Sequence, residues 1–300
     1  LALFVASIAV LGAEVKPFKW SGELNVPDPT SVTFDEAGNA YVASTTRRKA
    51  GDLDIREHRL WIPDDVGLTS PAEKLAFFQR ELAPGKMKAG RGSLKDHNKD
   101  GSVDWKDLTF HQERIYKLAD TDRDGVADKI TVFAEGFNSP VSGIAAGVLY
   151  FDGWVYLTAI PDVWRLKDTD GDGVADVKEV IATGFGGHIA YAGHDMHGLR
   201  LGPDGRIYWT VGDKGGNVTS KEGRHFFFAH EGAVLRCEPD GSRVETLGWN
   251  FRNNWEVAVD SFGTLWQSDN DDDGNKGVRI NYVMEFGNYG YKDELTGAAW

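Results

Sequence analysis

The sequence predicts an all-β fold of the β-propeller type. The main indication is a repeated pattern in which a short strand, a turn with Asp or Gly, and a strand with an aromatic residue follow one another. Repeats of about 40 to 60 residues that contain several short strands are typical of propeller blades. A second indication is that Gly, Asp and Asn separate short runs rich in Val, Ile, Tyr and Trp along most of the chain. The aligned aromatic positions are Tyr41, Tyr156, Tyr208 and Trp266.

The first interval between these repeats is much longer than the later ones, and its charged, helix-compatible segment 47–110 is expected to be an insertion. Within it, Ser70 is followed by Pro and then by apolar residues at helical spacing up to Leu82. This pattern predicts a helix with Ser70 as its N-cap, and it is the only convincing helix of the chain. The propeller domain is expected to occupy residues 18–300. Because the last strand-like run ends close to Trp300, we expect further blades downstream.

Composition limits the classes of protein and partner. With 300 residues, 41% hydrophobic and 12% aromatic, the chain can bury a large core. Its 33 basic and 46 acidic residues give a net charge of -13, which argues against nucleic acid or an anionic membrane surface as the main partner. The single cysteine, Cys237, excludes a disulfide framework and a Cys-x-x-Cys site within this sequence and is expected in a buried strand.

The first residues, LALFVASIAVLGA, are apolar and end in small side chains. They resemble the hydrophobic core and cleavage region of a secretory signal peptide, and they are short of the ~20 residues that a membrane span needs. We therefore expect residues 1–13 to be a truncated signal peptide and the protein to be exported, periplasmic or extracellular, with membrane association as a further option. The alternative is a buried N-terminal strand.

Four segments share an Asp-x-Asp/Asn-x-Asp-Gly core. In such loops, oxygen ligands at positions one, three and five converge on one hard cation, and Gly at position six permits the sharp turn. We predict structural calcium sites in hairpin loops, because strand-like runs precede the second and third loops where an EF-hand has helices. The alternative is a set of solvated Asp-Gly turns without ions. The predicted ligands are Asp96, Asn98, Asp100, Asp104 and Asp107; Asp120, Asp122, Asp124 and Asp128; Asp168, Asp170, Asp172, Asp176 and Glu179; and Asp269, Asp271 and Asp273.

The stretch from Gly193 to Gly216 is the candidate catalytic region. His194, Asp195 and His197 lie at or just before a strand that leads through a Gly-Pro-Asp-Gly turn into a second strand. Strand ends in all-β enzymes deliver polar groups to a pocket, and an imidazole that titrates near neutral pH suits a general base. Asp213 and Lys214, at the exit of the second strand, belong either to the pocket or to an ordinary Asp-Lys-Gly-Gly turn.

This stretch, together with the segment from Gly248 to Asp269, resembles the glucose/sorbosone dehydrogenase family of PQQ-dependent six-bladed propellers. The acidic loops between the blades resemble, more narrowly, the N-terminal propeller of membrane-bound dehydrogenases of planctomycete-type bacteria. The resemblance extends from Phe18 to Tyr291. It implies oxidation of a sugar or other alcohol, with hydride transfer to PQQ and electrons passed to a haem c domain or cytochrome.

The resemblance also implies roles for individual residues. His194 occupies the position of the family's general base, and His197 is its rival. Arg252 and Asn253 match an Arg-Asn pair that contacts the quinone, where the planar Arg fork can bind carboxylate and carbonyl oxygens. Asp271 and the residue after it replace a Gly-Pro pair that helps to bind the calcium and quinone of the family, so the chain departs from the family pattern there.

Two other functions remain open at this stage. One is a non-catalytic propeller that binds carbohydrate or protein, with calcium holding its loops. The other is a calcium-dependent lactonase-type hydrolase. Convergence of His194 and Arg252 on one central pocket would favour the dehydrogenase over a binding module. Dinucleotide-binding, P-loop and serine-hydrolase motifs are absent from the sequence.

Overall fold

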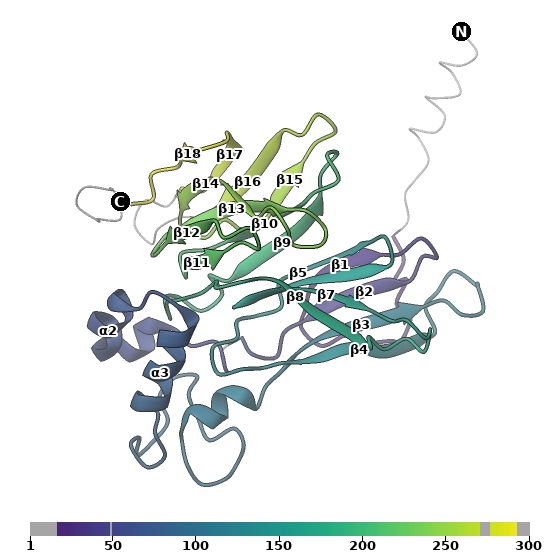
Figure 1. Cartoon of the computed structure of the whole chain (residues 1–300). Helices are drawn as coiled ribbons and strands as arrows, with labels where there is room; N and C mark the ends of the chain where they lie inside the picture. The colour runs from purple at the N-terminus through teal and green to yellow at the C-terminus, as the bar shows by residue number, and fades with distance from the viewer. Residues whose placement is uncertain (1–16, 49, 271–276, 293–300) are drawn as a thin grey trace, which may run out of the picture.

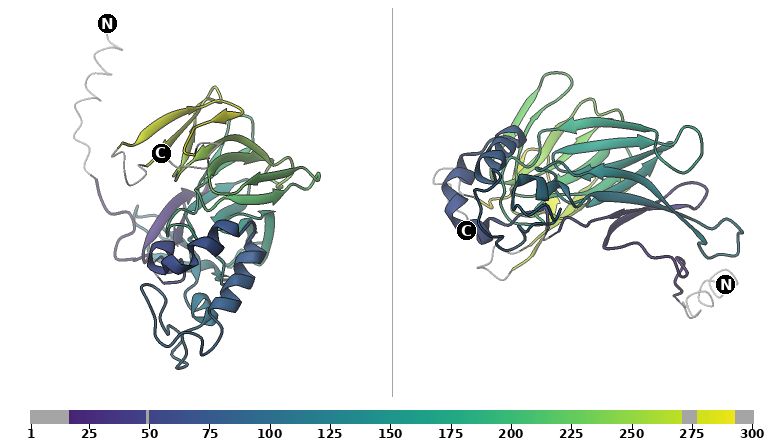
Figure 2. Two further views of the ribbon diagram at one scale, coloured as in Figure 1. Left: turned by 90° about the vertical axis from the view of Figure 1, so that its left-hand side faces the viewer. Right: turned by 90° about the horizontal axis from the view of Figure 1, so that it is seen from below.

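The computed structural model describes residues 17–48, 50–270 and 277–292, so the candidate signal peptide lies outside the described residues. The described chain folds into small antiparallel sheets that follow one another around a common axis, which confirms the predicted all-β propeller (Figures 1 and 2). Within the same residues, no helix is both long and apolar enough to cross a bilayer.

The first two blades are four-stranded sheets in which sequence neighbours pair. Blade 1 contains β1 (Pro29–Phe34), β2 (Ala40–Ser44), β3 (Glu113–Ala119) and β4 (Lys129–Phe137). Blade 2 contains β5 (Gly147–Phe151), β6 (Trp154–Ala159), β7 (Asp162–Lys167) and β8 (Val177–Thr183).

Blade 3 follows the same order, with a hairpin inserted after its second strand. Its strands are β9 (Met196–Leu201), β10 (Ile207–Val211), β13 (Gly232–Cys237) and β14 (Glu245–Phe251), and β18 (Gly287–Asn288) adds to its outer edge in parallel. The hairpin consists of β11 (Gly216–Thr219) and β12 (His225–Phe228). The described part of blade 4 is β15 (Val257–Val259), β16 (Leu265–Asp269) and β17 (Arg279–Val283).

The aromatic residues aligned from the sequence occupy equivalent places in these sheets. Tyr41, Tyr156, Tyr208 and Trp266 lie on β2, β6, β10 and β16, the second strand of each blade. The repeat is therefore a true blade repeat. The first interval is longer because residues 45–112 are inserted between β2 and β3, close to the expected limits of 47–110.

The core lies between neighbouring blades. One cluster, which includes Tyr41, Phe133 and Leu157, packs blade 1 against blade 2. Another, which includes Tyr156 and Trp209, packs blade 2 against blade 3. The first strands of successive blades, β1, β5, β9 and β15, also lie beside one another. The loops that enter these strands therefore meet around the propeller axis.

The insertion contains the predicted helix and more helical structure than expected. Helix α3 spans Pro71–Glu81, and the Ser70 hydroxyl accepts a hydrogen bond from the Glu73 amide, which confirms the predicted cap. A short helix α2 (Ile62–Gly67) and two 3-10 helices, η1 (Ile55–Trp61) and η2 (Trp105–Thr109), were not predicted, because segments of five to seven residues are too short to show helical periodicity.

A small core of its own stabilises the insertion. Phe77, Leu82, Leu94 and Leu108 are almost completely buried and form one apolar cluster. In Figure 1 the insertion lies beside the ring of sheets, with α2 and α3 close to the ends of the blade 3 strands. It is thus an ordered part of the domain and forms one side of its loop end.

Arg47 and Glu113 fasten the two ends of the insertion to the propeller. The buried Arg47 guanidinium donates to backbone carbonyls, including those of Leu108 (2.5 Å) and Ser142 (3.0 Å). The buried Glu113 carboxylate accepts from the amides of Arg47 (3.0 Å) and Ala145 (2.6 Å). Because Ser142 and Ala145 precede β5, these bonds fix the insertion relative to the axial strands.

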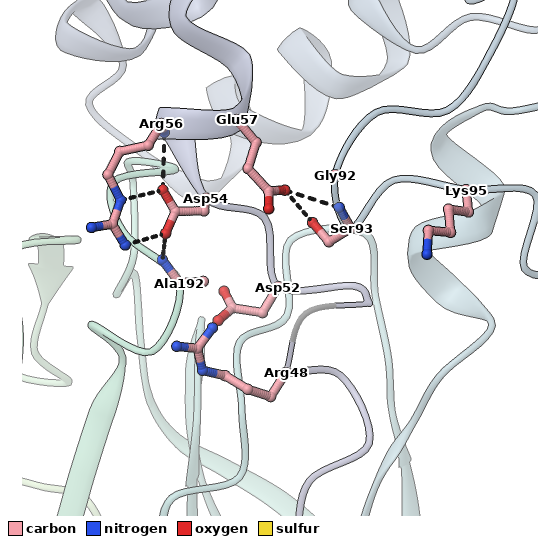
Figure 3. Close-up of a pocket in the computed structure, with 9 residues that line it drawn as sticks. All are labelled: Arg48, Asp52, Asp54, Arg56, Glu57, Gly92, Ser93, Lys95 and Ala192. Carbon is pink, nitrogen blue, oxygen red and sulfur yellow. Dashed lines mark hydrogen bonds and ion pairs between the residues drawn. The ribbon is translucent and has the colours of Figure 1, made fainter.

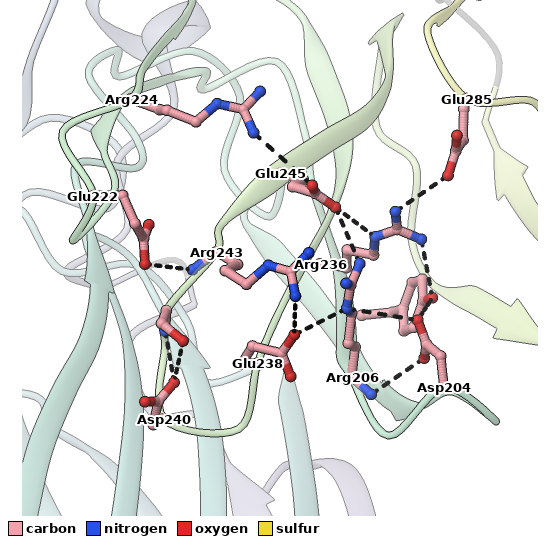
Figure 4. A network of polar contacts seen from close by, with 12 residues as sticks. Asp204, Arg206, Glu222, Arg224, Arg236, Glu238, Asp240, Arg243, Glu245 and Glu285 are labelled. Atoms are coloured by element: carbon pink, nitrogen blue, oxygen red, sulfur yellow. Dashed lines mark hydrogen bonds and ion pairs between the residues drawn. The ribbon is translucent and has the colours of Figure 1, made fainter.

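Residues at one end of the blade 3 strands form a network of ion pairs (Figure 4). Glu245 accepts from Arg236 at 2.8 Å and from Arg206 at 3.2 Å, and Arg236 also reaches Glu285 at 3.2 Å. These groups are partly exposed, so each pair contributes at most about 1 kcal/mol. The network lies at the strand ends and belongs to the framework of the blade.

Candidate functional site

Loops at one end of the propeller bring together a set of buried polar side chains. They come from the segment after β2, the segment before β9 and the start of β9 itself, the segment after β10, and the segment between β14 and β15. Burial of several charged groups at one place is costly unless they are paired, so such a cluster marks either a site or its supports. Its members include Asp52, His188, His194, Asp195, His197, Asp213, Lys214 and Arg252.

The central feature is a buried pair formed by His194 and Asp213. The His194 Nδ1 and the Asp213 Oδ1 are 2.8 Å apart, and the other carboxylate oxygen accepts from the Tyr291 hydroxyl at 3.3 Å. A carboxylate at Nδ1 fixes the proton there and leaves the lone pair on Nε2. Within the described residues, Nε2 makes no hydrogen bond. Nε2 is thus the ring nitrogen of His194 that has no partner in this part of the chain.

Asp213 was only a weak candidate in the sequence, because Asp-Lys-Gly-Gly is also an ordinary turn. The structure shows why it matters: Asp213 lies two residues after the end of β10, and His194 lies two residues before the start of β9, the strand that pairs with β10. Its amide donates to the Arg252 carbonyl at 2.7 Å. The backbone of blade 4's entry loop therefore fixes the position of this carboxylate.

Tyr191 joins the histidine to two arginines. Its ring lies edge-on to the His194 ring, with centroids 5.1 Å apart. The guanidinium carbons of Arg252 and Arg56 lie 5.5 Å and 4.7 Å from the centre of the same ring. His194 and Arg252 thus both lie against the ring of Tyr191.

The Arg252-Asn253 pair is held by Asp269. Both backbone amides donate to this carboxylate, at 3.1 Å and 2.8 Å, and Arg279 adds an ion pair at 2.7 Å. Asp269 was predicted as a calcium ligand but instead supports the loop of the predicted quinone contacts. The side-chain Oδ1 of Asn253 is buried and has no hydrogen-bond partner in the described chain. Asp271 and Asp273 lie outside the described residues.

His197 has a structural environment. Its Nδ1 lies 3.4 Å from the Asn254 carbonyl and its Nε2 lies 3.2 Å from the Gly193 carbonyl. Its ring stacks on Trp255 with centroids 3.8 Å apart. Burial lowers the pKa of His197 to about 3, so the ring stays neutral and supports the loop. The geometry therefore favours His194 over His197 as the base.

Asp195 and Lys214, predicted as catalytic and cofactor-binding residues, pair with each other. The Lys214 ammonium lies 3.0 Å from Asp195 and 2.5 Å from Asp52, and all three side chains are buried. Burial opposes the charge on Lys214, but the two carboxylates outweigh it and raise its pKa. Burial, followed by the nearby Asp195, raises the pKa of Asp52. The three form a structural ion cluster rather than a set of free functional groups.

Asp52 was missed by sequence reasoning, because nothing in the insertion marks it locally. It also accepts from the Gly193 amide at 2.8 Å, directly before His194. Through Asp52 the insertion is bonded both to Lys214 and to the loop that carries the candidate base. Only the fold reveals this link, since Asp52 and Gly193 lie far apart in the sequence.

A second polar layer lies beneath the site. His188 Nδ1 lies 2.6 Å from the Asp65 carbonyl, and its ring packs 3.8 Å from that of His230. Burial lowers the pKa of each of these histidines to about 4. Burial, with the charge of Lys214 next in importance, lowers the pKa of Lys74 to about 7.

The lowered pKa values of His188, His197 and the half-buried His230 predict a loss of stability in acid. Their folded pKa values lie below the ordinary value of 6.5, so between about pH 6.5 and 4 the unfolded chain binds more protons than the folded chain. The free energy of unfolding should therefore fall as the pH falls through this window. Urea unfolding of the wild type and of His188→Gln at several pH values will test this. The variant should show a shallower slope, and an equal slope would contradict the assignment.

Two of the predicted acidic loops have the arrangement of a cation site. The carboxylates of Asp120, Asp122 and Asp124 lie within 4.8 Å of one another, and those of Asp168, Asp170 and Asp172 do the same. Both loops join neighbouring strands, β3 to β4 and β7 to β8, as the strand-like flanks predicted. They lie at the strand ends and not among the residues around His194.

The acids at the ninth and twelfth positions of these two loops have other partners. Asp128 and Asp176 accept from the hydroxyls of Thr121 (2.6 Å) and Thr169 (2.5 Å). Glu179 lies on β8 and pairs with Arg165 at 2.6 Å, because its strand carries it away from the loop.

In the first loop the two outer acids cap a helix. Asp104 and Asp107 form the capping box of η2, and the buried Asp107 also accepts from the amides of His97 and Asn98. The Asp96 carboxylate accepts from the amides of Asp100 and Gly101. The acids that were expected to complete the ligand shell of this loop therefore accept hydrogen bonds from backbone amides.

Comparisons with known proteins agree with this fold. A family described as a domain of unknown function (DUF7133) matches residues 18–296. None of the curated proteins matches the chain significantly. Among solved structures, the PQQ-bound form of aldose sugar dehydrogenase from Streptomyces coelicolor is similar with a TM-score of 0.50 and 14% identity, over 91% of this chain and 66% of that chain.

Two further structures show weaker likeness. An oxidoreductase of the glucose dehydrogenase type from Thermus thermophilus has a TM-score of 0.48 and 16% identity, over 91% of this chain and 66% of that one. The PQQ domain of pyranose dehydrogenase from Coprinopsis cinerea has a TM-score of 0.42 and 13% identity, over 85% and 48%. The likeness to the Streptomyces coelicolor structure shows the propeller fold. This chain spans 66% of the length of that structure and of the Thermus thermophilus one.

Proposed function

This chain belongs to the DUF7133 family, and we propose that it is the propeller of a quinone-dependent dehydrogenase that oxidises a sugar or another alcohol. The observation that carries the proposal is the buried His194–Asp213 pair, which leaves Nε2 without a hydrogen bond in the described chain at the axial end of the propeller. The propeller fold shared with the PQQ-bound Streptomyces coelicolor enzyme supports the same class of cofactor.

The residues around His194 fit a quinone of the PQQ type. Such a quinone carries carboxylates and carbonyl oxygens, which need cationic donors. Arg252 supplies a buried guanidinium, and Asn253 supplies an amide whose buried Oδ1 has no partner in the described chain and can accept a hydrogen bond from the ligand. Lys292, whose pKa burial lowers, adds a second cation close to Asp213. We propose Arg252 and Asn253 as quinone contacts.

The proposed alcohol oxidation requires a hydride acceptor, which is the cofactor, and a proton acceptor, which is a residue of the chain. A quinone held by Arg252 and Asn253 would supply the acceptor for the hydride that leaves the carbon of the substrate alcohol. His194 Nε2 takes the hydroxyl proton, so the alcohol becomes a carbonyl compound and one proton resides on the imidazole. Asp213 stabilises the resulting imidazolium at Nδ1. Tyr291 and the Arg252 backbone hold the carboxylate in line with the ring.

Binding and turnover test this function directly. The calcium-loaded full chain is titrated with PQQ by calorimetry, and dye-linked oxidation of a panel of sugars and alcohols is then followed with and without PQQ. Saturable binding and PQQ-dependent oxidation are expected. A folded, calcium-loaded protein that binds no PQQ would contradict the proposal and favour a binding propeller.

We also propose that the loops Asp120–Asp124 and Asp168–Asp172 bind calcium structurally. The carboxylate clusters of both loops support this. A ligand that binds only the folded state stabilises it by about 2.7 kcal/mol at 100 times its Kd. Calcium should therefore raise the Tm relative to the chelator-treated protein, and Asp170→Asn should reduce this shift. Asp260→Asn, in the turn between β15 and β16, is the control, and an equal shift in all three proteins would contradict the site.

Export and electron transfer complete the proposal. The apolar stretch at residues 1–13 supports export, and a haem c domain or cytochrome would accept the electrons. Fractionation of cells that produce the full-length protein tests the first point. Reduction of a c-type cytochrome by the PQQ-loaded protein and substrate tests the second.

A further inference from the structure

A charged cleft of about 520 Å³ lies in the insertion, beside the segment that leads to His194 (Figure 3). Clefts of about 300 to 1,000 Å³ accommodate small molecules. The insertion provides all of the lining except Ala192, which lies beside Asp54. The lining residues are Arg48, Asp52, Asp54, Arg56, Glu57, Gly92, Ser93, Lys95 and Ala192.

The acidic residues of this cleft already have donors. Asp54 binds the Arg56 guanidinium through two bonds of 2.9 Å and 2.7 Å. Asp52 is buried and paired with Lys214. Glu57 accepts from the amide and the hydroxyl of Ser93, both at 2.9 Å and both through Oε2. The negative charge of the lining is therefore largely neutralised or hydrogen-bonded.

Two cationic side chains of the cleft do not pair with its acidic residues. Arg48 and Lys95 are both exposed, and no side-chain hydrogen bond or ion pair within the described residues involves either of them. Figure 3 draws both side chains without a dashed line, with Lys95 on the other side of the cleft from Arg56. Two uncommitted positive groups in one cleft can bind an anion, with the Arg fork as a bidentate donor and the ammonium as a point charge.

Two lining residues, Ala192 and Arg56, connect the cleft to the candidate base. Ala192 lines the cleft and its amide donates to Asp54 at 3.3 Å, and His194 follows two residues later. Arg56 lies over the Tyr191 ring, which in turn contacts the His194 ring. A ligand in the cleft would thus lie beside the loop that holds the base. The cationic groups of the cleft are also distinct from Arg252 and Asn253.

We propose that this cleft binds the carboxylate of a polyhydroxylated acid, such as a hexuronate, with Arg48 and Lys95 as the charged donors. Glu57 supports a hydroxylated ligand, because its Oε1 makes no hydrogen bond within the described chain and can accept one from a sugar hydroxyl. The inference rests on the proposed function only where it identifies this acid as the substrate. Binding of the acid requires neither PQQ nor turnover.

Calorimetric titration of the full chain with D-galacturonate and D-galactose tests the inference, because the two sugars differ only in the carboxylate. Galacturonate should bind at least about tenfold more tightly than galactose, since a hydrogen bond to a charged group contributes about 1.5 to 3 kcal/mol. Its affinity should fall as salt is added. Arg48→Gln and Lys95→Gln should each weaken galacturonate binding by about tenfold or more. Lys106→Gln, at an exposed position outside the cleft, should not.

The outcomes separate this inference from the proposed function. Equal affinity for both sugars, no binding of either, or galacturonate binding that neither variant weakens would overturn it. PQQ binding that is lost in the two variants, without galacturonate binding, would assign both cations to the quinone and also overturn it. Galacturonate binding that depends on Arg48 and Lys95, without PQQ-dependent oxidation, would support the inference and contradict the dehydrogenase.

Discussion

Asp213→Asn is expected to lower kcat for sugar oxidation by about 10²- to 10⁴-fold, the usual contribution of a general base. The neutral amide cannot stabilise the imidazolium of His194, and its NH₂ group can donate to Nδ1 and move the ring proton to Nε2. The size of the side chain is nearly unchanged, so the fold and the affinity for PQQ should be retained. Steady-state kinetics at saturating PQQ will measure the effect.

A matched control is Asp260→Asn, which makes the same chemical change in an exposed turn between β15 and β16. It should leave kcat within about twofold of the wild-type value. An unchanged kcat in Asp213→Asn would show that the carboxylate at Nδ1 has no part in proton transfer. A loss in both variants would indicate a general effect of the substitution.

Lys214→Met is expected to produce the largest loss of stability, about 3 to 5 kcal/mol in the free energy of unfolding. It leaves the buried Asp52 and Asp195 carboxylates beside each other without their shared cation. The exposed Lys221→Met is the control, with an expected change of about 0.5 kcal/mol or less. Urea unfolding at neutral pH compares the two.

A second substitution tests whether the loss of stability in Lys214→Met arises from the unpaired charges. Asp52→Asn in the Lys214→Met background removes one of the two unpaired charges and should recover part of the lost stability. If Lys214→Met costs no more than Lys221→Met, the ion cluster does not hold the insertion to blade 3. If the second substitution adds to the loss instead, the cost arises from packing rather than from charge.

The blades could be predicted from sequence because each is a local repeat. The strand–turn–strand pattern recurs around Tyr41, Tyr156, Tyr208 and Trp266, and each repeat forms one hairpin with the aromatic residue on the second strand. The helix after Ser70 was predictable for the same reason, since its cap and its periodicity are local signals.

The arrangement of the site was only partly predictable. His194 could be identified as a candidate, but its partner Asp213 and its neighbour Tyr191 depend on how the ends of β9 and β10 meet. Asp195 and Lys214 looked like free functional groups in sequence, and only the fold shows that they share the ion cluster of Asp52.

The ligands of the acidic loops were also only partly predictable from the sequence. Their first three acids follow from local spacing, whereas the ninth and twelfth positions depend on the direction of the next element. In the third loop, β8 carries Glu179 to Arg165. In the first loop, η2 uses Asp104 and Asp107 as its cap. Spacing alone therefore predicts the cluster of acids but not a complete shell.

The most direct test of the account is a single turnover of the PQQ-loaded protein mixed rapidly with an oxidisable sugar, followed by the absorbance of the quinone. The account predicts rapid reduction in the wild type and reduction at least about 10²-fold slower in His194→Ala, with PQQ still bound in both. Equal reduction rates in the two proteins would contradict the role of His194 as the base.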